Sequence, residues 1–102
     1  MHMKQDDKRF DAIHRVIKRG DLTKLKQELE SGLDPNLMNR FDWTFLMLTA
    51  LHGRTDMAEL LIANGAVVSS ENDFGNTAVS LAKLKGHKRT QEFIGQANEC
   101  VF

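Results

Sequence analysis

The sequence lacks several features that would assign it to a class of protein at once. Among its 102 residues there is one cysteine, Cys100, so no disulfide forms within the chain. It has no apolar run of about 20 residues, the length that spans a membrane, and no apolar leader after Met1. A lone cysteine without a secretory leader favours a reducing compartment. We therefore expect one domain, without membrane contact, in the cytoplasm or the nucleus.

An excess of charge of one sign is also missing. Fourteen lysines and arginines balance fourteen aspartates and glutamates, and the formal net charge is zero. A duplex-binding domain usually has a strong basic excess, so this balance disfavours nucleic acid as the partner. The best case for nucleic acid, or for an acidic partner, is the basic run from Lys83 to Arg89. No aromatic residue interrupts the run as a stacking platform, and solvated helix ends explain it more simply.

Motifs for metal, phosphate and cofactor binding are missing as well. The sequence has no cysteine pair and no closely spaced histidine pair that could ligate a metal ion. It contains neither a glycine-rich phosphate loop nor a dinucleotide fingerprint. The sequence thus predicts a protein that needs no cofactor and no metal ion.

What the sequence does contain is a repeat with a period of 33 residues. The period is carried by two sets of glycines and by several equivalent pairs: Gly20, Gly53 and Gly86; Gly32 and Gly65; Phe41 and Phe74; Thr44 and Thr77. A fixed period of 20 to 50 residues marks a solenoid, in which each unit buries its apolar face against the next. We expect units at about 7–40, 41–73 and 74–102, with residues 1–6 flexible or derived from a tag.

Each unit should form two helices. Apolar residues recur at helical spacing on both sides of Gly20, Gly53 and Gly86. Glycine readily adopts the positive φ at which a helix ends and the chain reverses. The outer units should present polar faces to solvent, and two groups of residues fit this need: Lys24, Lys26, Glu28 and Glu30, and Lys88, Arg89, Gln91 and Gln96.

This pattern resembles the ankyrin repeat over roughly residues 7–98. The stretch from Gly53 to Ala66, GRTDMAELLIANGA, resembles the second helix of that repeat, and Gly86-His87 resembles its Gly-His step. The family's Thr-Pro-Leu-His signature is never complete here. The resemblance implies an all-α, helix–turn–helix solenoid of about three repeats with polar capping faces, which binds another protein without being an enzyme. Because neighbouring units lie about 10 Å apart, we expect no catalytic set of histidines to converge.

In ankyrin-like arrays the turn tips and the ends of the first helices line a concave binding face. The resemblance places nine residues of this chain there: Arg40, Phe41, Trp43, Leu51, His52, Phe74, Asn76, Leu84 and Lys85. Five of them are apolar where a consensus array would be polar or variable: Phe41, Trp43, Leu51, Phe74 and Leu84. Half-exposed aromatic residues here would form a patch as large as many functional ones. Sideways packing of Phe41 and Phe74 on the neighbouring turn is the alternative.

These nine residues predict the kind of partner. An aromatic centre flanked by lysines and arginines of the first and third units fits a protein or peptide segment with an apolar anchor and acidic neighbours. Docking through the flat helical side of the solenoid is a second possibility. Binding through Lys83 to Arg89 is the alternative from a different class, and a strong salt dependence would reveal it.

Overall fold

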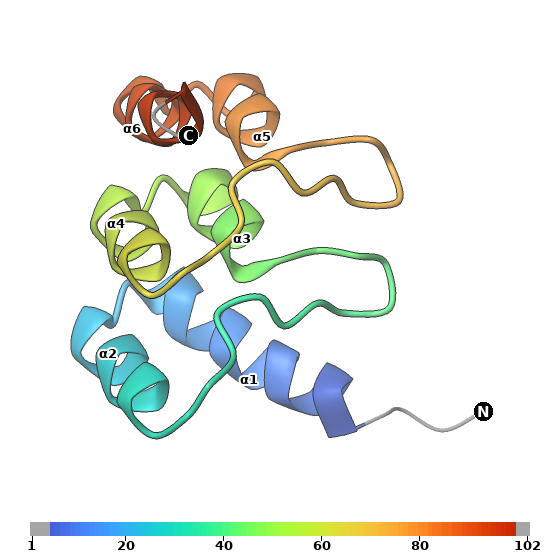
Figure 1. Ribbon diagram of the computed structural model, residues 1–102, viewed down its shortest axis with the longest axis vertical. Coiled ribbons are helices and arrows are strands. Elements are labelled where there is room, and N and C mark those ends of the chain that lie inside the picture. The colour runs from blue at the N-terminus through green and yellow to red at the C-terminus, as the bar shows by residue number, and fades with distance from the viewer. Residues whose placement is uncertain (1–4, 100–102) are drawn as a thin grey trace.

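The structure, a computed structural model, describes residues 5–99, and within that range it has six helices and no strand. In chain order the helices are α1 (Gln5–Arg19), α2 (Leu22–Glu30), α3 (Phe45–His52), α4 (Thr55–Ala63), α5 (Ala78–Leu84) and α6 (Lys88–Glu99). They form three antiparallel pairs stacked in three layers (Figure 1). This confirms the predicted all-α solenoid. Helix α1 begins two residues before the expected start of the first unit, and Cys100 lies outside the described residues.

The glycines end the first helix of each layer, as predicted. Gly53 follows α3 with a φ of 69°, and its amide donates to the carbonyl of Ala50. A side chain strains a residue in this left-handed region. The equivalent Gly20 and Gly86 have φ values of 75° and 77°.

Threonine starts the first helix in the second and third layers. The Thr44 side chain accepts a hydrogen bond from the amide of Met47, and the Thr77 side chain accepts one from the amide of Ser80. These N-caps satisfy amides that have no partner within the helix. The Thr-Pro-Leu-His signature is incomplete in these two layers, but its threonine is present and caps α3 and α5.

Two loops, which we call fingers, join the layers and project to the same side (Figure 1). The first finger comprises residues 38–44 and the second comprises residues 71–77. The Asn39 side-chain oxygen accepts the amides of Phe41 and Trp43 at 2.9 and 3.0 Å, and Asn72 plays the same part in the second finger. The Asp73 amide donates to the Phe41 carbonyl at 3.0 Å, so the second finger stacks on the first.

Helix α1 takes the place of a finger in the first layer. The amide of Arg40, one repeat before Asp73, donates to the carboxylate of Asp7 at 3.1 Å. The ring of Phe10 stacks on Phe45 with 4.9 Å between the ring centroids. The long first helix therefore covers the side of the first finger that faces away from the second.

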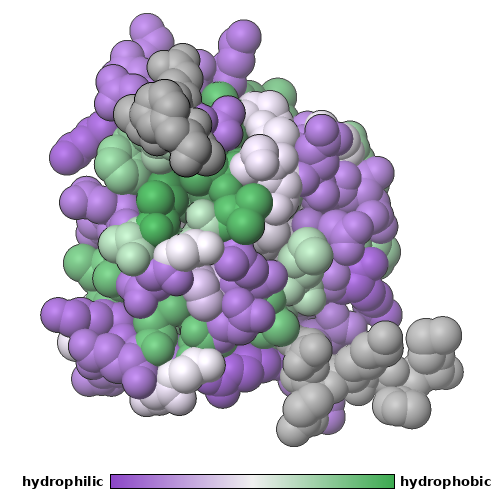
Figure 2. Space-filling view, viewed as in Figure 1, coloured by the Kyte–Doolittle hydropathy of each residue, from purple (hydrophilic) through white to green (hydrophobic). Residues whose placement is uncertain are grey.

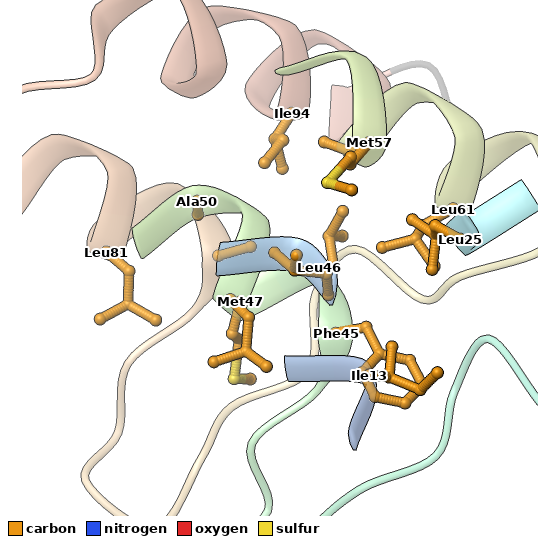
Figure 3. Close-up of a cluster of buried hydrophobic side chains, with 14 of the residues drawn as sticks. Ile13, Leu25, Phe45, Leu46, Met47, Ala50, Met57, Leu61, Leu81 and Ile94 are labelled. Atoms are coloured by element: carbon orange, nitrogen blue, oxygen red, sulfur yellow. The ribbon is translucent and has the colours of Figure 1, made fainter. Parts of the chain in front are cut away.

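One apolar core runs through all three layers (Figure 3). Buried side chains from the first, second and third layers meet in it: Ile13 and Leu25; Leu46, Met57 and Leu61; Leu81 and Ile94. The middle layer buries Met47 and Ala50, whereas their equivalents in the last layer, Ser80 and Lys83, are exposed. The last layer thus has polar, exposed residues at positions where the middle layer has apolar, buried ones, as a capping repeat requires.

Candidate functional site

A groove of about 240 Å³ lies between α1, the first finger and α3. Its lining combines apolar and polar side chains: Phe10, Asp11, His14, Asn39, Phe41, Trp43, Leu48 and Leu51. Helices α1 and α3 pack against each other, and both helices and the first finger contribute side chains to the lining. An apolar pocket with a few convergent polar groups is the usual form of a recognition site.

Three of the nine predicted site residues line this groove. They are Phe41, Trp43 and Leu51. Phe41 is 47% exposed, and the guanidinium of Arg40 lies 5.3 Å from the centroid of its ring. Trp43 is half-buried and packs against the core. Phe41 is therefore the accessible aromatic group of the groove, whereas Trp43 is partly structural.

Four other predicted residues lie away from the groove. Phe74 and Asn76 are on the second finger, and Leu84 and Lys85 are at the end of α5. Phe74 and Leu84 are each 72% exposed. All four belong to the third layer, one repeat step from α1, so they do not share one cavity with Phe41. The nine-residue binding face therefore stays a prediction, of which three residues line this groove.

His52, the last residue of α3, meets a residue of another layer. Its Nε2 atom lies 3.3 Å from Nε2 of His14 on α1, and the ring centroids are 5.5 Å apart. The rings therefore meet head-on and share a hydrogen bond. The expectation that side chains of neighbouring units stay about 10 Å apart is wrong for this pair, because long side chains span the space between two packed helices.

Burial lowers the pKa of both histidines. For His14, Asp11 opposes this effect, whereas Lys18 and Arg15 add to it. For His52, every charge that acts on the ring is positive. Both shifts therefore favour the neutral ring, and the surrounding charges are positive at His52 but of mixed sign at His14.

Charged residues of both signs lie on the elements that form the groove and on the second finger. Lys18 and Arg19 are exposed at the end of α1, but Asp42 lies at the tip of the first finger and Asp73 on the second. Desolvation and the Asp42 carboxylate raise the pKa of Asp73. Acidic groups thus occupy the fingers, and the basic flank from the first and third units stays a prediction.

The basic run from Lys83 to Arg89 is divided by the fold. Lys83 and Lys85 are exposed on and just after α5. His87, Lys88 and Arg89 line a separate cavity of about 550 Å³, and Asp56 and Glu59 of α4 line it too. The run therefore does not form one uniformly basic surface.

The flat helical side also presents apolar groups. A second groove of about 390 Å³ between α2 and α4 is lined in part by Leu22, Leu60 and Ala63. Figure 2 shows further apolar surface over α4 and the segment that follows it, where Val67 is 49% exposed. Docking through this side thus has a physical basis of its own.

The sequence reasoning missed five groove residues: Phe10, Asp11, His14, Asn39 and Leu48. The period itself offered one signal, because Phe10 lies 33 residues before Trp43. Within the described residues, no three metal-ligating side chains gather into a possible metal site. In the same part of the chain, no helix has both the length and the apolar character to cross a membrane.

Comparison with known proteins places these features in a family. The family model described as ankyrin repeats (3 copies) matches residues 13–100. Similar proteins include the potassium channel GORK of Arabidopsis thaliana, 36% identical over 72% of this chain and 9% of the channel. The dauer abnormal formation protein 25 of Caenorhabditis elegans is 33% identical over 81% of this chain and 22% of that protein. The ankyrin repeat, SAM and basic leucine zipper domain-containing protein 1 of Mus musculus is 38% identical over 78% of this chain and 17% of that protein. The chain thus spans less than a quarter of the length of each of these relatives.

Proposed function

Because the chain belongs to the ankyrin-repeat family, whose members are generally protein-interaction modules, we propose that it binds a protein partner through the groove between α1, the first finger and α3. The observation that supports this proposal most directly is Phe41. This residue is 47% exposed, and it lines the groove together with Trp43 and Leu51. Aromatic side chains of this kind are common anchors of protein interfaces.

The proposed role is binding without catalysis. The family is generally non-enzymatic, and the groove offers surface for an apolar anchor together with polar groups that orient it. The partner is a protein or peptide segment with an apolar side chain and acidic neighbours, which complement Lys18 and Arg19 at the helix ends. A cytoplasmic or nuclear location is part of this proposal, since the sequence has a single cysteine.

The test compares two exposed apolar residues on opposite sides of the molecule. Immobilised wild-type protein, Phe41→Ala and Leu22→Ala are used to capture partners from a lysate. A partner retained by wild type and Leu22→Ala but lost by Phe41→Ala supports the groove. Loss of an interface anchor typically weakens binding by about 2 kcal/mol or more.

The opposite pattern identifies another surface. A partner lost by Leu22→Ala and retained by Phe41→Ala contradicts the groove and favours the flat helical side. Capture that is sensitive to nuclease and falls steeply with salt favours the nucleic-acid alternative through Lys83 to Arg89. Circular dichroism of each variant confirms that the folded protein is compared.

A further inference from the structure

The histidine pair lies where a partner's polar group would meet the groove. His14 lines the groove beside Leu51 and Trp43, and His52 touches His14 through their Nε2 atoms at 3.3 Å. Within the described residues, neither ring makes another hydrogen bond to the protein, and both Nδ1 atoms are without a protein partner. The pair is therefore free to exchange its internal hydrogen bond for one to a ligand.

The charges around His52 favour a negative ligand. From α1, Asp11 has the largest charge effect on His14, which is negative, and Lys18 and Arg15 act on it with positive charge. Arg54, which precedes α4, and His87, which precedes α6, add positive charge at His52. A metal cation would be repelled by most of these groups. A doubly charged phosphate would face Asp11, which lines the same groove, so a singly charged carboxylate fits better.

Building on the proposed function, we infer that the His14–His52 pair receives a carboxylate of the partner segment whose apolar side chain occupies the groove, and takes up one proton from solvent as it does so. In the free protein one Nε2–H is donated to the other ring. Once a proton has been added, both Nε2 atoms carry hydrogen and both donate to the carboxylate. Hydrogen bonds between charged partners are roughly twice as strong as those between neutral groups.

Proton uptake has a measurable consequence. Affinity should rise by about tenfold for each pH unit as the pH falls from the pKa of the bound pair toward that of the free pair. The same fall in pH destabilises the free protein, because burial disfavours charged imidazole in the native state. Binding and stability should therefore depend on pH with opposite signs.

The experiment uses a phage-displayed library of random dodecapeptides, selected on wild-type protein at pH 6.0. Peptides whose binding is lost in Phe41→Ala are synthesised with their Asp or Glu residues and with Asn or Gln in the same places. We expect the neutral peptides to bind at least tenfold more weakly. His14→Gln and His52→Gln should remove the pH dependence, whereas Leu22→Ala, on the flat helical side, should keep it.

A direct measurement on wild-type protein completes the test. Histidine proton resonances, followed by NMR with and without peptide, should show that the acidic peptide raises the pKa of His14 or His52. Groove peptides that need no carboxylate, or that bind with the same affinity from pH 5.5 to 7.5, overturn the inference and leave the proposed function intact. A selection that yields no peptide dependent on Phe41 overturns both.

Discussion

Replacing Gly53 by alanine should destabilise the protein more than replacing its equivalent, Gly86. Both glycines have φ near 70–80°, so both substitutions meet the same backbone strain of about 1 kcal/mol. Their surroundings differ. A Cβ atom at Gly53 would lie 2.7 Å from Nδ1 and 3.0 Å from Cγ of His87. At Gly86, apart from the glycine itself and its two neighbours in the chain, no atom of the described residues lies within 4 Å of the corresponding position.

The magnitude follows from these two terms. Gly86→Ala should cost about 1 kcal/mol, since strain is its main term. Gly53→Ala must also move the His87 ring, which is half-buried, and should cost about 2–3 kcal/mol in all. For a domain of this size each 1 kcal/mol lowers the Tm by about 4–8 °C. The difference between the two variants should therefore be resolved easily by thermal unfolding.

Urea unfolding of four proteins measures the contact itself: wild type, Gly53→Ala, His87→Ala and the double variant. If the ring is the obstacle, Gly53→Ala should cost only the strain of about 1 kcal/mol once His87 is alanine. Equal losses of stability in Gly53→Ala and Gly86→Ala would refute the reasoning. They would show that His87 moves aside without cost.

Three further predictions concern the first finger and the groove. Asp42 is the non-glycine residue with positive φ, 62°, in the described residues, so Asp42→Gly should raise the free energy of unfolding by about 1 kcal/mol; a decrease in urea unfolding would contradict this. Burial lowers the pKa of His14 and His52, so the unfolded chain binds more protons and stability should fall as the pH drops below about 6.5. Replacing both histidines by glutamine should flatten that profile, and a profile as steep as that of wild type would show that other groups control it. Trp43→Ala should cost about 2 kcal/mol of stability because the ring packs on the core, whereas Phe41→Ala should cost under about 1 kcal/mol; equal Tm losses would place both rings in the core.

The repeat and the helices within it can be predicted from the amino-acid sequence alone. A period of 33 residues places Gly20, Gly53 and Gly86 at equivalent turns, and each has the positive φ that its position requires. The capping threonines follow the same period. These features are local, since each depends on a few neighbouring residues and on the backbone preferences of glycine and threonine. Repetition then makes a weak local signal unambiguous.

Which side chains form the groove depends on how the helices pack in three dimensions. His14 and His52 are 38 residues apart in the sequence. The sequence pattern does not predict that the ring of His14 in the first layer contacts the ring of His52 in the second. Phe10 and Asp11 enter the site because α1 extends beneath the first finger, where Asp7 holds the amide of Arg40. Phe74 and Leu84 are left outside it because they lie one layer away. These contacts depend on how α1 packs against α3. That packing is a non-local arrangement, which the 33-residue period does not predict.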